Sequence, residues 1–395
     1  MRFISKVNLR YYKSIGSCSV DLSDLTVLVG PNGSGKSNFI DSLFFVSDAL
    51  NATLDYAIRQ RSGINAVRKR SGGHPTNFAI SLRLHLPSGS NAIYSFQIGA
   101  ERDGGHSVLK EYMLVSSDEI IPSEFLYENG KLKRCSSDIV LPPSVLGDRL
   151  AIQIASGQEP VREVFDVLSG AHFYNIYPED FRLPQQHDNG DYLLRSGKNI
   201  ASVVRNLENN YPEQFDRVRA YLRQIIEPLQ GISYRSLGPA ETIEFLQRVA
   251  GQKHSWKFFA SQMSDGTLRS LAILVALFQV NPSKESGLVL GIEEPEATIH
   301  PAACAVLTDA LIEASKSKQV IVTTHSPELL EHPGLNIDDL RIVESFDGDT
   351  RISPADPASR RVVKEKLIST GELLRKNQLQ PDVNYREQFS FMDKL

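Results

Sequence analysis

The stretch Gly30–Ser37, GPNGSGKS, decides the fold because it matches the pattern G-x-x-x-x-G-K-[ST]. It follows the apolar run TVLV at 26–29 and precedes a segment with one apolar helical face, formed by Phe39, Leu43, Val46 and Leu50. Its glycines allow the backbone to turn its N–H groups towards phosphate oxygens, and Lys36 adds a positive charge. Strand, loop and helix together predict a loop that holds a triphosphate, with Ser37 as a ligand for Mg²⁺.

A second motif, GIEEPEATIHP at 291–301, places two glutamates where the apolar run 288–292 ends. Ligands of α/β sheets bind at the carboxyl ends of strands. We therefore expect Glu293 to face a magnesium ion and Glu294 to orient the water that attacks the terminal phosphate. The alternative is a solvated strand exit that carries ordinary surface charges.

Two further segments gain meaning only beside these motifs. Ser264-Asp265-Gly266-Thr267 reads as the start of an apolar helix, and capping that helix would be sufficient reason for its sequence. His325 follows the β-branched run QVIVTT, where a single histidine is more often structural than a contact to substrate.

The pattern along the chain predicts an α/β protein. Strands are expected at 3–9, 17–22 and 26–29, and an antiparallel β meander at 78–114. Helical spacing follows, and strands and helices then alternate: helices at 267–278 and 302–314, strands at 288–292 and 320–323. The predicted units are an N-terminal lobe at 1–150, a helical insertion at 151–250, a C-terminal lobe at 251–345 and an extension at 346–395, with no long coiled coil. FDGDT in the extension predicts a hairpin turn.

The composition is that of an ordinary globular protein: 395 residues, 41% hydrophobic, 23% charged, net charge −4. Residues 56–100 contain no Asp or Glu but six basic side chains: Arg59, Arg61, Arg68, Lys69, Arg70 and Arg83. They predict either a solvated lobe or contact with nucleotide phosphates or nucleic acid. Three scattered cysteines suit a reducing cytosol, and without a long apolar run we expect a cytoplasmic chain with no membrane contact.

In this order the four motifs resemble the phosphate loop, signature motif, Walker B strand and switch histidine of ABC-type ATPases. More narrowly, the chain resembles the RecF/SMC/OLD-like branch, often labelled AAA_21, over about 1–115 and 250–345. The resemblance implies an ABC-ATPase head, with a mixed or parallel sheet, helices and the meander. It also implies that two heads close on two ATP molecules, as a dimer or a higher homo-oligomer.

The resemblance carries residue roles with it. Catalysis would rest on Lys36, Glu294 and His325, and Mg²⁺ would be held by Ser37 and Glu293. ATP would be bound by Gly30, Asn32, Gly33, Ser34, Gly35, Lys36, Ser37 and Asn38 of one head and by Ser264, Gly266 and Thr267 of the other. Arg10 and Lys13 fall where relatives contact base or ribose.

The departures from the family pattern are Glu293, where relatives have Asp, and Asp265, where transporter-like signatures have Gly. The usual glutamine before the helical region is not identifiable, with Gln60 and His74 as candidates. By analogy with Septu and PARIS antiphage systems, we expect an ATPase that senses and regulates a partner nuclease or toxin. The alternatives are a RecF-like repair ATPase that binds DNA directly and a slow-hydrolysing scaffold held together by ATP.

Overall fold

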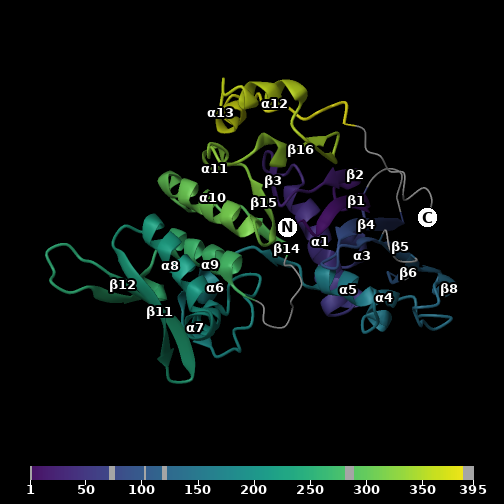
Figure 1. Cartoon of the computed structure of the whole chain (residues 1–395), viewed down its shortest axis with the longest axis horizontal. Helices are drawn as coiled ribbons and strands as arrows, with labels where there is room; N and C mark the ends of the chain where they lie inside the picture. The colour runs from purple at the N-terminus through teal and green to yellow at the C-terminus, as the bar shows by residue number, and fades with distance from the viewer. Residues whose placement is uncertain (1, 71–75, 102–103, 118–121, 281–288, 386–395) are drawn as a thin grey trace.

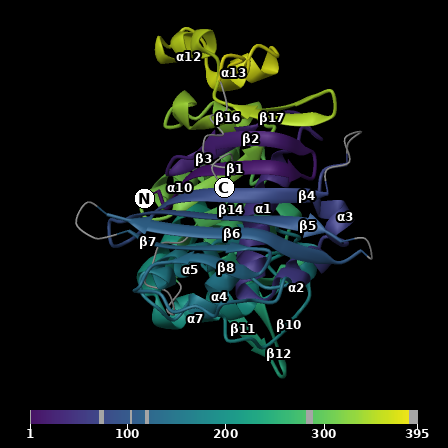
Figure 2. The same ribbon diagram turned by 90° about the vertical axis from the view of Figure 1, so that its right-hand side faces the viewer.

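The computed structural model describes residues 2–70, 76–101, 104–117, 122–280 and 289–385. Its first layer is a seven-stranded antiparallel sheet in the order β2-β1-β4-β5-β6-β7-β8. The strands are β1 Ile4–Tyr12, β2 Ile15–Asp21, β4 Asn77–His85, β5 Asn91–Ala100, β6 His106–Ser116, β7 Ser123–Glu128 and β8 Lys131–Cys135. The predicted N-terminal strands and the meander are confirmed. Figure 2 shows these strands crossing the front of the molecule, with α1 behind them.

The second layer is a six-stranded sheet in the order β17-β16-β3-β15-β14-β9. Its strands are β3 Leu25–Val29, β9 His172–Tyr174, β14 Val289–Glu293, β15 Gln319–Thr324, β16 Leu340–Phe346 and β17 Asp349–Ser353. All neighbours pair in parallel except β16 and β17, which form the antiparallel hairpin that FDGDT predicts. Parallel pairing brings the carboxyl ends of β3, β14, β15 and β9 to one edge.

Helix α1, Lys36–Asn51, packs between the layers. Phe45 of α1 meets Tyr12 and Phe78 of the first sheet edge to face, at ring centroids of 6.1 and 5.4 Å. Short helices surround it: α2 Leu54–Arg59, α3 Ile64–Val67, α4 Ala151–Ala155 and α5 Val161–Ser169. The four residues of the apolar face predicted after the phosphate loop are also buried, in a core that includes residues of both sheets.

The predicted helical insertion is only partly helical. Besides α4 and α5, its helices are α6 Glu179–Arg182, α7 Ile200–Asn210 and α8 Pro212–Ile225. The prediction is wrong for residues 229–247, where β11 Leu229–Leu237 and β12 Ala240–Gln247 pair antiparallel, flanked by β10 Gln185–Gln186 and β13 Trp256–Phe259. Residues 241–245 of β12 are buried on both faces of the strand, and α7 packs against β12. This subdomain lies at the lower left of Figure 1.

Two long helices return the chain to the six-stranded sheet: α9 Asp265–Phe278, after the 3-10 turn Ala260–Gln262, and α10 Pro301–Ser315. Beyond β15 come α11 Pro327–Leu330, a 3-10 turn at Ile337–Asp339, α12 Pro357–Lys364 and α13 Thr370–Arg375, with the last two at the top of Figure 1. The longest described helix has 16 residues, which agrees with the predicted absence of a long coiled coil. Within the described residues, no helix is long and apolar enough to cross a membrane.

One buried carboxyl group in the first layer makes stability depend on pH. Glu111 accepts hydrogen bonds from the first two N–H groups of α4, on Ala151 and Ile152, at 2.5 and 3.0 Å, and from the hydroxyl of Tyr94 at 3.0 Å. Complete burial raises the pKa of Glu111 from 4.5 to about 7. Between these values the folded chain holds a proton that the unfolded chain has lost, so stability falls as the pH rises.

We expect Glu111→Gln to remove most of this dependence, because glutamine does not titrate. The parental protein should lose roughly 3 kcal/mol at most of unfolding free energy between pH 4.5 and pH 7 through this group. Urea denaturation at pH 5 and pH 7.5 measures the loss. Equal slopes in the parent and in Glu111→Gln would show that another group carries it.

Candidate functional site

The phosphate loop connects β3 to α1 at the shared carboxyl edge. Gly33 and Gly35 adopt left-handed φ values of 77° and 107°, which L side chains rarely adopt. A Cβ at Gly35 would stand 2.1 Å from Oγ1 of Thr350. The Nζ atom of Lys36 donates to the carbonyl oxygens of Gly30 and Pro31 at 2.7 and 3.0 Å. The ammonium group therefore lies inside the loop, and burial lowers its pKa.

The hairpin β16–β17, which lies more than 300 residues later in the sequence, contacts this loop and stabilises it. Thr350 of β17 donates to the carbonyl oxygen of Ser34 at 2.9 Å and lies 2.7 Å from the hydroxyl of Ser14. Asn38 donates to that same hydroxyl at 2.7 Å. Asn38, predicted to contact nucleotide, thus also ties α1 to the β1–β2 turn. Thr350 was missed because its sequence neighbours predict only a hairpin.

The exit of β14 carries three carboxylates, and they face different groups. Glu294 has a left-handed φ of 44°, and its N–H donates to the carbonyl oxygen and hydroxyl of Thr323, each at 3.1 Å. Its Oε1 lies 3.3 Å from Nδ1 of His325. Glu294 also acts electrostatically on Lys36. The structure therefore brings the three residues predicted to be catalytic to one edge.

Glu293 has a different charged neighbour from Glu294. Its Oε1 lies 3.9 Å from a guanidinium nitrogen of Arg195, which stacks over the ring of Phe44 with 4.2 Å between guanidinium carbon and ring centroid. The electrostatic neighbours that shift the pKa of Lys36 are Glu294 and Glu296. Glu293 is thus held beside Arg195.

Glu296 is a site residue that the sequence did not single out. It is 7% exposed, and its Oε1 accepts a hydrogen bond from Thr324 at 2.5 Å. Its Oε2 is buried without a hydrogen-bond partner in the described part of the chain. Burial raises the pKa of this carboxyl group, and its charge acts on Lys36. No sequence signal indicated that this third glutamate is buried.

The signature segment caps α9, as the sequence predicts. The hydroxyl of Ser264 accepts the N–H of Thr267 at 3.3 Å, and Ser264 is exposed. A Cβ on Gly266 would lie 2.5 Å from the carbonyl oxygen of Thr298, which is also exposed. Only glycine allows this approach, so the signature segment and the loop after Glu294 form one continuous surface.

Arg269 links α9, from inside the protein, to the segments that follow β9 and β14. Its guanidinium group donates to the carbonyl oxygens of Glu293 and Glu294, both at 3.0 Å, and to that of Ile176 at 2.5 Å. It is 8% exposed. One residue of α9 therefore holds three backbone carbonyl groups in place, two at the end of β14 and one after β9. An arginine within an apolar helix gave the only sequence signal for this role.

Neither candidate for the missing glutamine is identified by the structure. Gln60 is exposed at the C-terminal end of α2, and His74 lies outside the described residues. The place beside Glu293 at the sheet edge belongs to Asn175, one residue beyond the pair of Ile292 and Tyr174.

Comparisons with known proteins identify the family of this chain. The model of the family described as "AAA domain, putative AbiEii toxin, Type IV TA system", AAA_21, matches residues 25–331. The chain belongs to the AAA_21 family. This match includes all four motifs and the subdomain between them.

Solved structures show the same fold in SMC heads. An SmcHead bound to the C-winged helix domain of ScpA superimposes with a TM-score of 0.54 at 15% identity, over 89% of this chain and 97% of that one. A Pyrococcus furiosus Smc head with an extended coiled coil, bound to the C-terminal domain of ScpA, gives 0.50 at 14% identity, over 93% and 100%. This AAA_21 chain thus has an ATPase head fold of the ABC and SMC kind.

Curated relatives match only in short segments. The chromosome partition protein Smc of Methanocaldococcus jannaschii is 46% identical over 44 residues, 11% of this chain and 4% of the relative. That of Synechocystis sp. is 30% identical over 117 residues, 28% of this chain and 9% of the relative. The AAA_21 chain therefore spans a small part of the length of these relatives.

The donor set of this AAA_21 site fits a magnesium ion held mainly by water and phosphate. Mg²⁺ usually takes one or two protein oxygens in such sites and keeps several waters. Ser37 is exposed at the start of α1, and the unpartnered oxygen of Glu296 is a second candidate beside the predicted Glu293. Within the described ranges, no cluster of three or more His, Cys, Asp or Glu suits a metal on its own.

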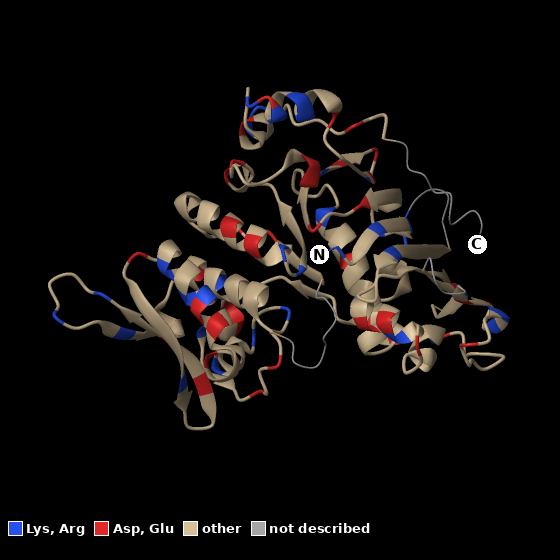
Figure 3. Ribbon diagram, viewed as in Figure 1, with Lys and Arg blue, Asp and Glu red and all other residues tan. Residues whose placement is uncertain are grey.

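Arg59, Arg61 and Lys69 of the basic segment at 56–100 pair with acids. Arg61, with 5% of its side chain exposed, bridges Asp41 and Asp48 of α1 at 2.9 Å each. Lys69 pairs with Asp349 and Arg59 with Asp55, whereas Lys13, outside the segment, pairs with Asp41. Figure 3 shows positive and negative residues interspersed over many elements. These pairs favour the structural explanation of the segment over a nucleic-acid surface.

Proposed function

We propose that the chain is an ATPase that binds ATP and Mg²⁺ between two heads and hydrolyses the ATP. The convergence of Lys36, Glu294 and His325 at one sheet edge carries the proposal. Lys36 and the loop N–H groups hold the β- and γ-phosphates. Glu294, beside His325, orients the attacking water, and Mg²⁺ neutralises charge on the phosphates when bound.

The second head supplies the signature segment. Ser264 and Thr267 begin a long helix whose N-terminus attracts an anion, and Ser264 is exposed beside Thr298. A second copy that docks on this surface would complete the γ-phosphate site. Asn175, beside Glu293, takes the position of the missing glutamine in this arrangement.

Mixing two inactive variants tests the shared site. Lys36→Ala destroys the phosphate loop but keeps the signature, whereas Ser264→Arg does the reverse. In a 1:1 mixture half of the dimers are mixed and each has one intact site, so hydrolysis should recover up to about a quarter of the parental rate. Each variant alone is the control. A mixture that stays inactive would place the signature segment outside the site.

We further propose that this ATPase acts in the cytoplasm as a sensor that regulates a partner effector, a nuclease or a toxin, in antiphage defence. The family description, with its toxin and its toxin–antitoxin system, supports an effector connection. The similar SMC heads were solved with a bound partner protein, which supports regulation through a docked chain.

Slow turnover is the second candidate, and the contact of Glu293 favours it. A carboxylate beside Arg195, 3.9 Å away, must leave that partner before it can approach a magnesium ion. ATP would then act mainly to hold two heads together. A RecF-like role with direct DNA binding has less support, because acidic partners already neutralise Arg59, Arg61 and Lys69 of the basic segment.

A further inference from the structure

A cavity with aromatic walls lies between α1, α2, the edge strand β9 and the loop that joins β10 to α7. Its volume of about 530 Å³ is within the range of sites that enclose a small organic ligand. Tyr56 and Tyr192, each 45% exposed, are large side chains that the fold leaves uncovered on its wall. Six aromatic side chains of the described chain line it: Phe44, Tyr56, His172, Phe173, Tyr174 and Tyr192. We call this cavity the aromatic pocket.

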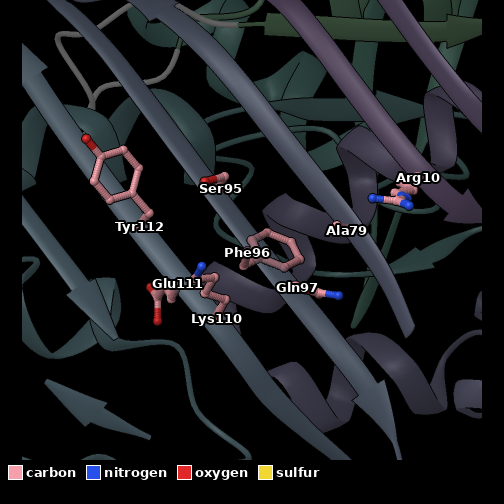
Figure 4. Close-up of a pocket in the computed structure, with 8 residues that line it drawn as sticks. All are labelled: Arg10, Ala79, Ser95, Phe96, Gln97, Lys110, Glu111 and Tyr112. Atoms are coloured by element: carbon pink, nitrogen blue, oxygen red, sulfur yellow. The ribbon is translucent and has the colours of Figure 1, made fainter. Parts of the chain in front are cut away.

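The pocket in Figure 4 is much smaller. It lies among β1, β4, β5 and β6, with Arg10, Ser95 and Tyr112 among the residues that line it. Its volume of about 50 Å³ holds a few water molecules and no larger molecule. Of these two cavities, the aromatic pocket is therefore the one that can take an organic ligand.

Hydrogen bonds hold the rings of the aromatic pocket in place. The His172 ring lies beside those of Tyr174 and Tyr192, with centroids 6.4 and 5.1 Å away and interplanar angles of 27° and 31°. The side chain of Gln279 donates to the hydroxyl of Tyr174 at 2.5 Å and accepts the N–H of Leu193 at 2.7 Å. Gln279 thus joins β9 to the loop that carries Tyr192. Ring faces at small angles to one another suit a planar aromatic ligand that stacks on them.

Two charged side chains line the aromatic pocket with hydrogen-bonding groups to spare. The guanidinium carbon of Arg195 lies 4.2 Å from the ring centroid of Phe44, which orients the group. Within the described residues its N–H groups have no hydrogen-bond partner, because Oε1 of Glu293, at 3.9 Å, is too far away. The carboxylate of Asp191 has neither an ion pair nor a hydrogen bond in the same part of the chain. A guanidinium group binds a phosphate through two N–H groups, and a carboxylate accepts from hydroxyl groups.

The balance of charge limits how many phosphates a ligand can carry here. Asp48, the third charged residue of the lining, is already paired with Arg61 at 2.9 Å. Among the described lining residues, Arg195 is thus the cation left for an anionic ligand. A triphosphate needs a lysine and a metal ion, as the phosphate loop provides, whereas one guanidinium group matches one phosphate. The aromatic base, the ribose hydroxyls and the phosphate of a nucleoside monophosphate match the rings, Asp191 and Arg195. We propose that the aromatic pocket binds a nucleoside monophosphate, with its phosphate on Arg195.

Arg195 also connects the aromatic pocket to the edge that carries the motifs. Its guanidinium group lies 3.9 Å from Oε1 of Glu293, the carboxylate expected to approach Mg²⁺. A phosphate on Arg195 competes with Glu293 for the same positive charge, so binding should release Glu293 and speed hydrolysis. This effect on turnover rests on the proposed ATPase function, whereas the binding site does not.

Equilibrium dialysis measures the site by itself in Lys36→Ala, whose phosphate loop no longer competes for nucleotide. Labelled AMP, GMP, CMP and UMP are the probes, and at least one should bind with a Kd below about 1 mM. Adding Arg195→Gln should weaken that binding roughly ten-fold or more, because a charge-assisted contact is lost. Arg162→Gln, at an exposed position of α5 outside the pocket, is the matched control.

Three results of the dialysis would overturn the site. They are no binding of any of the four probes up to about 10 mM, equal binding by the Arg195→Gln and Arg162→Gln proteins, and tighter binding of tryptophan. Tryptophan is the competing probe because its ring, carboxylate and ammonium group match the same side chains, although it fills less of the cavity.

Protection from labelling tests the site in a protein with an intact phosphate loop. Leu194→Cys lies in the lining and Leu183→Cys outside it, and both leucines are exposed, at 38% and 67%. With the exposed Cys135 changed to Ser, each variant reacts with a maleimide in the presence of each probe at about 10 mM. At least one probe should slow the reaction of Leu194→Cys roughly five-fold or more and leave that of Leu183→Cys unchanged. Equal rates with and without every probe would overturn the site.

Turnover under saturating ATP tests the link to Glu293. The monophosphate that binds should raise hydrolysis roughly five-fold. Arg195→Gln should hydrolyse faster without it and lose the response. A probe that binds in dialysis but leaves turnover unchanged would overturn the release of Glu293. A parent protein without any hydrolysis would contradict the proposed ATPase function, and the dialysis result would still decide the binding site.

Discussion

Glu294→Gln is expected to lower ATP hydrolysis by about 100-fold or more while ATP still binds. The side chain lies beside His325 and acts on Lys36, so its carboxylate is placed to orient a water molecule near the terminal phosphate. Glutamine keeps the size of the side chain but loses its basicity. Initial rates of phosphate release, with binding of labelled ATP measured in parallel, test the expectation.

The same variant should accumulate an ATP-dependent dimer, because hydrolysis would otherwise reopen the heads. Size-exclusion chromatography with and without ATP detects it. Glu227→Gln, at an exposed position after α8, is the matched control and should behave as the parent does. Hydrolysis at the parental rate in Glu294→Gln would refute the role given to Glu294. The trapped dimer also serves as bait, and a nuclease or toxin that copurifies with it would support the proposed regulation.

Lys36→Ala is expected to weaken ATP binding by roughly 100-fold or more, because a charge-assisted contact to phosphate is lost. The Nζ atom already donates to two carbonyl oxygens of the loop, so the loop holds the ammonium group where phosphate would lie. Titration with a fluorescent ATP analogue measures the change. Lys131→Ala, on the exposed strand β8, controls for loss of positive charge.

Loss of the Lys36 contacts could also loosen the loop itself. Thermal unfolding without nucleotide separates the two effects, because a folded variant that fails to bind ATP isolates the contact with phosphate. Unchanged affinity in Lys36→Ala would remove the phosphate-loop assignment altogether.

The local sequence was enough to predict the strands and helices that carry the motifs. The phosphate loop needs glycines at left-handed positions and lies between a strand and a helix, and both requirements are visible in 26–50. The strand and helix order after 265 is equally clear, because buried parallel strands and apolar helices leave strong patterns. The hairpin at residues 229–247 was missed because charged residues interrupt its apolar pattern, and the buried Glu241 and Glu244 find their basic partners only in the folded chain.

The partners of the site residues depended on tertiary structure. The motif around Glu293 suggested a magnesium ligand, but Arg195 and Phe44 come from distant segments and hold that carboxylate beside them. Glu296 entered the site because the loop after β14 folds back beneath Thr324. The spacing of a motif predicts which residues lie at the end of one strand. The groups that a side chain contacts there depend on residues from other segments.

The sequence by itself determined that a triphosphate loop, a carboxylate-bearing strand end and a histidine belong to one sheet, because each motif carries its own strand. Only the tertiary structure decided that Thr350 supports the phosphate loop and that Arg269 holds the backbone of Glu293 and Glu294 at the end of β14. It alone placed β9 beside β14, with Phe173 and Tyr174 in the aromatic pocket. The physical reason is register: residues far apart in the sequence become neighbours only when the strands pair.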